Sequence, residues 1–238
     1  MEIRWLGHSA FEIISDDVHI LIDPFISNNP SCPVPVEELN PDIILVTHGH
    51  SDHLGDALDI SNSCNAPIAA NHEISLFLSK QGIEAIGVNI GGSFIFRDIK
   101  FTMLDAKHSS DIDMVEEMVP GGVAASFLIT FEDGTSIFHS GDTGLFGDMK
   151  TIIGDIYKPD IVMVPIGDKF TMGPFEAALA SMWLNPKVTI PMHYNTFPPI
   201  AQDPTIFANF VMQFNPKIST VILNPNEYFE YNPEEYQD

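Results

Sequence analysis

Basic residues are scarce in this chain. Its 238 residues include 10 Lys and Arg against 33 Asp and Glu, which gives a formal net charge of −23. Nucleic acid and anionic membranes carry charge of the same sign, so such a surface repels them. We therefore expect no nucleic-acid partner, and a hydrated surface accounts for the excess of acidic side chains.

Cysteines and long apolar runs are scarce as well. Cys32 and Cys64 are the only cysteines, and they form no CxxC pair. Free thiols are therefore expected, as in a reducing compartment. No apolar run is long enough to cross a bilayer, and the N-terminus lacks the basic and apolar regions of a signal peptide. These absences predict a cytoplasmic protein without membrane insertion.

The chain does contain a regular alternation of apolar strands and helices. Its length and the even spread of 18 prolines and 16 glycines favour one domain over residues 1–238. Strands are expected at 2–6, 10–14, 18–22, 42–46, 67–70, 84–88, 93–96, 100–104, 123–131, 136–138, 160–164, 187–190 and 220–223. Helices are expected at 55–60, 71–81, 174–184 and 204–214. Because both halves contain strands and helices, the economical fold is an α/β four-layer αββα sandwich of two mixed β-sheets.

The segment 47–53, Thr-His-Gly-His-Ser-Asp-His, directly follows an apolar strand. It places three imidazoles and a carboxylate within seven residues, which are the ligands that a cation such as Zn²⁺ prefers. In an extended turn, His48 and His50 point the same way and can share one ion, whereas Asp52 and His53 can face a second. Buried without a metal, these groups would lack partners, so the segment predicts a metal site.

Three further candidate ligands stand just after expected strands. They are His108, Asp142 in a Ser-Gly-Asp-Thr-Gly segment, and His193 in Pro-Met-His-Tyr. Open α/β proteins bind their ligands at the carboxyl ends of strands. We therefore expect these side chains to complete the site begun by the segment 47–53.

The order HxHxDH, then His, then Asp, then His resembles the metallo-β-lactamase superfamily. Further short strings resemble more closely a prokaryotic family of metal-dependent hydrolases of unassigned substrate, related to ascorbate-6-phosphate lactonase and more distantly to phospholipase D-type hydrolases that cleave N-acyl phosphatidylethanolamine. The strings are Trp5-Leu6-Gly7-His8, Ile22-Asp23-Pro24, Gly141-Asp142-Thr143-Gly144, Pro165-Ile166-Gly167-Asp168, Thr171-Met172-Gly173-Pro174 and Pro191-Met192-His193-Tyr194. The resemblance covers nearly the whole chain.

The resemblance implies a site for two divalent ions. His48, His50 and His108 would bind the first ion, Asp52, His53 and His193 the second, and Asp142 would bridge them. Zinc is the first candidate, and Mn, Fe, Ni and Co remain open. The zinc β-lactamases commonly place Cys where Asp142 stands here, so antibiotic hydrolysis is not expected.

The sequence therefore predicts a dinuclear metal-dependent hydrolase that acts on a small-molecule ester, lactone, thioester or phosphodiester bond. A hydroxide bridging the two metals would be the nucleophile. The candidate catalytic residues are Asp52, which would steer the water, and His8, which the resemblance places near the pocket. The relatives often assemble into homo-oligomers, so a homo-oligomer is open here too.

Two alternatives stay open at this point. One is a nuclease or cyclic-nucleotide phosphodiesterase with the same metal centre, and the other is a metal-binding protein that hydrolyses nothing. The roles of three side chains are open as well. Asp23 could accept a hydrogen bond from a ligand imidazole or form a turn, His139 could be catalytic or structural, and Lys169 could bind an anionic substrate or remain solvated.

Overall fold

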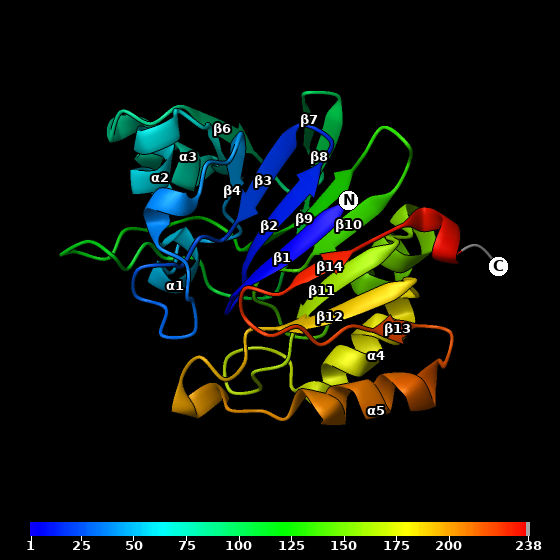
Figure 1. The fold of residues 1–238 in the computed structure, drawn as a ribbon. Coiled ribbons are helices and arrows are strands. Elements are labelled where there is room, and N and C mark those ends of the chain that lie inside the picture. Colours follow the sequence, from blue (N-terminus) through cyan, green and yellow to red (C-terminus); the bar gives the residue numbers. More distant parts are fainter. Residues whose placement is uncertain (237–238) are drawn as a thin grey trace.

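The computed structural model describes residues 1–236 and contains two seven-stranded sheets packed face to face (Figure 1). Helices lie on the outer side of each sheet, so the predicted α/β four-layer αββα sandwich is confirmed. The first sheet contains, in spatial order, β14 (Tyr228–Glu230), β1 (Glu2–Gly7), β2 (Ala10–Ser15), β3 (Val18–Ile22), β4 (Ile43–Leu45), β5 (Ile68–Asn71) and β6 (Ala85–Val88). The second contains β13 (Ser219–Thr220), β12 (Val188–Met192), β11 (Ile161–Pro165), β10 (Ser136–His139), β9 (Ala125–Thr130), β8 (Ile99–Asp105) and β7 (Ser93–Phe96).

Each sheet is antiparallel on one side and parallel on the other. Strands β1 to β3 pair antiparallel through short turns. Strands β7 to β10 also pair antiparallel, with short turns from β7 to β8 and from β9 to β10 and a long loop, residues 106–124, between β8 and β9. Strands β3 to β6 and β10 to β13 pair parallel. Parallel neighbours need longer crossover connections, and most of these contain a helix. The helices are α1 (Ser51–Leu54), α2 (Ala57–Cys64), α3 (His72–Lys80), η2 (Met149–Tyr157), α4 (Pro174–Leu184) and α5 (Pro204–Phe214), with single helical turns at Val36–Glu38, Pro198–Ile200 and Pro233–Tyr236.

The hydrophobic core lies between the two sheets. Phe11 of the first sheet and Phe101, Phe127 and Phe138 of the second are fully buried there. Burying one such side chain contributes about 1.5–3 kcal/mol. A rigid core of this kind fixes the positions of the strand ends, on which the candidate site depends.

Several elements differ from their predicted bounds. The helix expected at 55–60 is α2, which runs from Ala57 to Cys64, and a separate helix that was not predicted, α1, begins inside the segment 47–53 and ends at Leu54. The segment is therefore a helical turn after His50 rather than extended throughout. Strand β14 was not predicted, because it is short and its partner β1 lies at the other end of the chain. Helix η2 was not predicted either. At its end the backbone N–H of Lys158 donates to the carbonyl oxygen of Ile153, an i to i−5 pattern rather than the i to i−4 pattern of an α-helix.

Two smaller expectations can be compared with the structure. Cys32 and Cys64 are both free thiols, as expected. Among the residues that the structure describes, no helix combines the length and the apolar character that spanning a membrane requires.

Candidate metal centre

The candidate ligands meet at one edge of the sandwich. Each follows a strand that ends there: β4 precedes the segment 47–53, β8 precedes His108, β10 precedes Asp142, and β12 precedes His193. All of the candidate ligands fall into groups whose ligand atoms lie within 4.8 Å of one another. The structure therefore brings together every residue that the sequence analysis proposed for the metals.

The first group contains His48, His50 and His108. His48 Nε2 and His50 Nδ1 are 3.0 Å apart, and both rings lie 5.1 Å from the ring of His108. Nitrogens that share a tetrahedral zinc ion at ~2.0–2.1 Å lie about 3.3 Å apart, so the spacing fits one ion. Gly49 allows this arrangement, because a Cβ there would lie 2.7 Å from the carbonyl oxygen of Ser110.

The second group contains His8, Asp52, His53 and His193. Helix α1 presents Asp52 and His53 on successive residues, so both side chains reach the space beside His193. The helix begins without a side-chain cap of its own. Instead, Asp113 accepts a hydrogen bond from the backbone N–H of Ser51 at 2.7 Å, which holds the start of the helix in place.

Asp142 lies between the two groups. Its Oδ2 is 3.0 Å from His193 Nε2 and 3.6 Å from His108 Nε2, while its Oδ1 is 3.3 Å from His53 Nε2. The preceding Gly141 has φ +57, and a Cβ there would lie 2.8 Å from the backbone oxygen of Ala125. The close-packed glycine turn thus positions the carboxylate where it contacts histidines of both groups.

Several buried atoms of the site have no hydrogen-bond partner. They are His53 Nε2, Asp142 Oδ1 and both ring nitrogens of His193. Leaving buried polar atoms unpaired is costly, and native proteins rarely tolerate several of them together. Imidazole nitrogens and carboxylate oxygens that converge without bonding one another fit a bound divalent cation.

The electrostatics of the cluster favour a neutral His48, an anionic Asp142 and a protonated His53. Burial holds the pKa of His48 well below its usual value, so that imidazole is neutral. Burial alone would raise the pKa of Asp142, but His193 and His53 outweigh it and hold the pKa well below the usual range. For His53 burial opposes the charge, yet Asp142 and Asp23 raise its pKa well above the usual value. An anionic carboxylate therefore lies among imidazoles, which suits metal binding.

Asp23, at the end of β3, orients two of the ligands from behind. Its Oδ2 accepts hydrogen bonds from His53 Nδ1 at 2.8 Å and from the Thr47 hydroxyl at 2.7 Å. The Thr47 oxygen in turn lies 3.0 Å from His48 Nδ1. With their Nδ1 atoms engaged, both rings direct Nε2 to the site, as histidine ligands of metals commonly do. Of the two roles left open for Asp23, the structure supports hydrogen bonding to a ligand.

His8 is buried behind Asp52 and does not line the pocket. Its Nε2 is 3.1 Å from Asp52 Oδ2, its Nδ1 is 2.9 Å from the Thr196 hydroxyl, and its ring centroid is 4.0 Å from that of His193. Burial and the nearby His193 lower the pKa of His8 to about 4, so the ring is neutral. Because the ring of His8 is neutral, only one of its nitrogens carries a hydrogen. If Nε2 donates that hydrogen to the Asp52 carboxylate, Nδ1 accepts a hydrogen bond from the Thr196 hydroxyl.

His139 and Lys169, whose roles the sequence left open, lie outside the cluster of candidate ligands. His139 is fully buried, where its Nε2 lies 3.0 Å from the Ser9 carbonyl and its Nδ1 accepts from the backbone N–H of Gly141. It therefore fixes the turn that carries Asp142. Lys169 Nζ lies 5.2 Å from the ring centre of Phe170, and Lys169 is not among the residues of the pocket wall.

A pocket of about 270 Å³ opens onto the candidate ligands. It is lined by His50, Asp52, His108, Ser109, Asp113, Asp142, Phe170 and His193. The sequence analysis did not identify Ser109, Asp113 or Thr196. These three residues lie in irregular loops, where no strand end or ligand spacing marks them.

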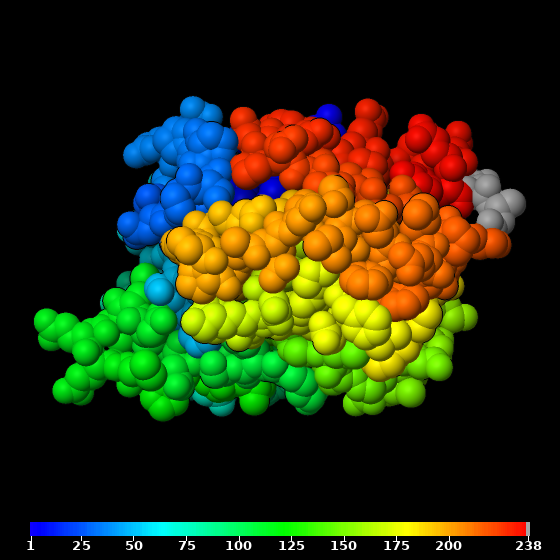
Figure 2. All heavy atoms as spheres, turned by 90° about the horizontal axis from the view of Figure 1, so that it is seen from below, coloured from blue at the N-terminus to red at the C-terminus, as the bar shows by residue number. Residues whose placement is uncertain are grey.

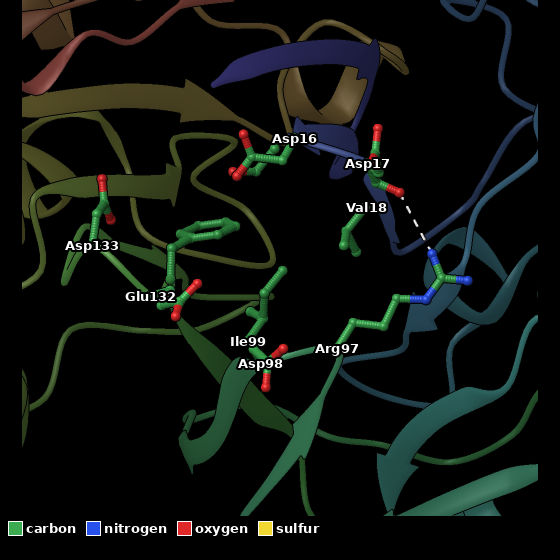
Figure 3. A pocket seen from close by; sticks show the side chains of 10 residues that line it. Asp16, Asp17, Val18, Arg97, Asp98, Ile99, Glu132 and Asp133 are labelled. Atoms are coloured by element: carbon green, nitrogen blue, oxygen red, sulfur yellow. Dashed lines mark hydrogen bonds between the residues drawn. The ribbon is translucent and has the colours of Figure 1, made fainter.

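A larger hollow of about 530 Å³ lies at the opposite edge of the sandwich (Figure 3). It is formed by the turns that join β2 to β3, β7 to β8 and β9 to β10, and it is lined by Asp16, Asp17, Arg97, Asp98 and Glu132 among others. It contains no histidine or cysteine, and its arginine pairs with Asp42 at 2.8 Å. Of the two, the smaller pocket is the one that the candidate metal ligands line.

Comparison with known proteins agrees with this geometry. A model of the β-lactamase superfamily domain matches residues 2–193. Proteins named UPF0173 metal-dependent hydrolase from Methanobrevibacter smithii and Methanosphaera stadtmanae are 78% and 56% identical to this chain, covering 100% and 95% of it and 100% and 98% of their own lengths. The solved structure of a metallo hydrolase from Ignicoccus hospitalis is similar with a TM-score of 0.87 at 37% identity, over 97% of this chain and 99% of that one.

Proposed function

This chain belongs to the β-lactamase superfamily and, within it, to the UPF0173 family of metal-dependent hydrolases, and we propose that it hydrolyses a small molecule at a dinuclear metal centre. The observation that carries the proposal is the pair of ligand groups joined by Asp142 at the base of one pocket. Two groups joined by one carboxylate suit two ions rather than one.

In this proposal the ligands follow the two groups, except that His8, which lies behind Asp52, is not a ligand. His48, His50 and His108 would hold one ion, Asp52, His53 and His193 would hold the other, and Asp142 would serve both. Zinc suits this set of imidazoles and carboxylates, and Mn, Fe, Ni and Co are the other candidates. When bound, the two ions supply an activated water and a Lewis acid for the oxygen of the scissile group.

Asp52 connects the metal ligands with the pocket. Its side chain is 32% exposed and lines the cavity, while Oδ2 accepts from the buried His8. Hydrogen bonding from His8 helps to hold the pKa of Asp52 well below its usual value despite burial. Asp52 is therefore an anionic acceptor that can orient a water in the pocket, and His8 is a positioning residue that fixes the carboxylate.

The pocket favours a small substrate. A volume of about 270 Å³ suits a small molecule, and no Lys or Arg is present among the described residues that line it. A polynucleotide would need a basic track, which this lining does not supply. In this proposal the bond cleaved is an ester, lactone, thioester or phosphodiester. The proposed location is cytoplasmic, because the two free cysteines are typical of a reducing compartment.

Elemental analysis combined with a substrate panel tests the proposed function. We expect the purified protein, loaded with Zn or Mn, to hold about two ions per chain and to hydrolyse at least one of the four bond classes. The panel includes cyclic nucleotides and a β-lactam, so it also covers the nuclease-type and antibiotic activities. Binding of fewer than one ion per chain would refute the dinuclear centre, and full loading without any hydrolysis would favour a metal-binding protein that is not an enzyme.

The contact between Thr196 and His8 gives a second test. Thr196→Val removes the hydroxyl that donates to His8 Nδ1. The imidazole is then no longer held in the tautomer that carries its hydrogen on Nε2. Asp52 then loses its fixed donor, and we expect turnover or metal affinity to fall about 10–100-fold, as for other residues that orient metal ligands. Thr196→Ser keeps the hydroxyl and should restore both. Equal losses in the Val and Ser variants, measured by kinetics and metal titration, would show that the hydroxyl has no such role.

A further inference from the structure

Phe170 is the only apolar side chain in the wall of the candidate pocket. The other residues that line the pocket are histidines, aspartates and a serine. Phe170 is 54% exposed. Single exposed apolar side chains are common on protein surfaces. Among the exposed large apolar residues that the structure describes, however, Phe170 alone lines this pocket. Its ring therefore meets whatever occupies the space beside the candidate metal ligands.

Backbone hydrogen bonds fix the turn that carries Phe170. The turn joins β11 to helix α4, and it is closed by the N–H of Asp168, which donates to the carbonyl oxygen of Met172 at 3.0 Å. The N–H of Met172 donates in turn to the carbonyl oxygen of Thr143 at 3.0 Å, directly after Asp142 in the chain. The turn is therefore tied to the segment that positions the carboxylate between the two ligand groups.

The same turn packs against the segment that carries His193. The N–H of Ile166 donates to the carbonyl oxygen of Met192 at 3.0 Å, and a Cβ at Gly167 would lie 2.4 Å from the backbone oxygen of His193. Figure 2 shows the yellow-green segment that contains the turn at the surface of the molecule, beside the green loop that precedes β9. Two candidate ligand segments thus hold the aromatic residue at the pocket, and a preorganised wall lowers the entropic cost of binding a ligand.

Lys169 does not close off the ring of Phe170. Lys169 is exposed, and its Nζ lies 5.2 Å from the centre of that ring. The attraction between an exposed ammonium group and an aromatic ring is weak, and Lys169 is not part of the pocket wall. A group of the substrate can therefore reach the ring from the pocket without breaking a strong internal contact.

We propose that Phe170 is a specificity-determining residue and that the substrate carries an apolar group of about the size of an aromatic ring. The inference rests on the proposed function, because it places the bond to be cleaved at the candidate metal ligands. A small, wholly polar substrate would leave the ring of Phe170 in contact with water, whereas an apolar group would remove the pocket side of the ring from water. Aromatic groups gain further from stacked or edge-to-face contact at about 4.5–7 Å. The pocket wall contains no Lys or Arg, so it does not select an anionic group in place of an apolar one.

Calorimetry with two hydroxamates tests the inference without requiring turnover. Hydroxamates chelate metal ions, and acetohydroxamate and phenylacetohydroxamate differ only in one phenyl ring. We expect the metal-loaded wild type to bind phenylacetohydroxamate about 10-fold more tightly than acetohydroxamate. In Phe170→Ala this difference should fall below about 2-fold, because no ring remains to contact the phenyl group. Acetohydroxamate should bind this variant as it binds the wild type.

Two further variants and a kinetic measurement sharpen the test. Phe170→Leu keeps an apolar side chain, so it should retain a difference of about 3-fold between the two hydroxamates. Phe175→Ala is the matched control: Phe175 is 47% exposed on α4 and does not line the pocket, so the full difference should remain. For a hydrolysed substrate that carries a phenyl group, Phe170→Ala should raise KM and leave kcat unchanged, since it removes binding that is equal in the ground and transition states.

A failure of this inference can be distinguished from a failure of the proposed function. If acetohydroxamate does not bind the metal-loaded wild type, the proposed metal centre is wrong and the inference falls with it. Three results would refute only the role of Phe170: equal binding of the two hydroxamates by the wild type, a full difference in Phe170→Ala, and an equal loss in Phe175→Ala. If Phe170→Ala no longer binds acetohydroxamate because its fold is damaged, the comparison of Phe170→Leu with the wild type decides.

Discussion

Replacing Asp142 with Asn is expected to remove most of the bound metal and nearly all hydrolysis. The carboxylate oxygens of Asp142 lie 3.0 Å from His193, 3.3 Å from His53 and 3.6 Å from His108. Asn keeps the size of the side chain but supplies no negative charge to offset two cations. Metal ions contribute several kcal/mol of transition-state stabilisation, and each 1.36 kcal/mol corresponds to a tenfold change in rate, so turnover should fall by about 1,000-fold or more.

Elemental analysis separates this effect from general damage to the protein. We expect the Asp142→Asn variant to retain its circular dichroism spectrum and to hold clearly fewer ions per chain than the wild type. Asp98→Asn is a suitable control, because Asp98 lines the acidic hollow at the opposite edge (Figure 3), and Asn tolerates its left-handed backbone at φ +65. Normal metal content in Asp142→Asn, or an equal loss in Asp98→Asn, would contradict the role given to Asp142.

The candidate metal ligands that the sequence analysis identified share one property: each is marked by a pattern in the few residues around it. The segment 47–53 carries its ligands within one turn, and His108, Asp142 and His193 each follow an apolar strand that is recognisable from its own residues. In a sandwich of this kind the strand order brings those ends to one edge. The prediction therefore needed the strands and their directions, and it did not need the detailed packing.

Long-range contacts fix what the sequence did not reveal. Helix α1 begins at Ser51 because Asp113, 62 residues later, accepts the hydrogen bond from its backbone N–H. The loop that carries Asp113 is itself held by Asn71, whose side chain donates to the carbonyl oxygens of Gly121 and Val123. No spacing in the sequence encodes such contacts. Thr196 was missed for the same reason, since its partner His8 lies 188 residues away.

The second large effect is expected for Asp52→Asn. The side chain of Asp52 is 32% exposed and fills no core position, so the fold should be retained. The carboxylate is held ionised and is both a candidate ligand and the acceptor that faces the pocket. Loss of a positioned proton acceptor costs about 100–10,000-fold in rate. Steady-state kinetics on metal-loaded protein measure the loss, and near-normal turnover with metal bound would remove Asp52 from the mechanism.

A double-mutant cycle then shows whether His8 acts through Asp52 or by itself. His8 is 1% exposed, is absent from the pocket wall, and touches Asp52 Oδ2 at 3.1 Å. If its only role is to fix that carboxylate, His8→Ala should slow the wild type but add little to Asp52→Asn, because residues that act as a unit are not additive. If the imidazole touched the substrate, the two losses would multiply. The burial of His8 and its contacts on both ring nitrogens favour the first result.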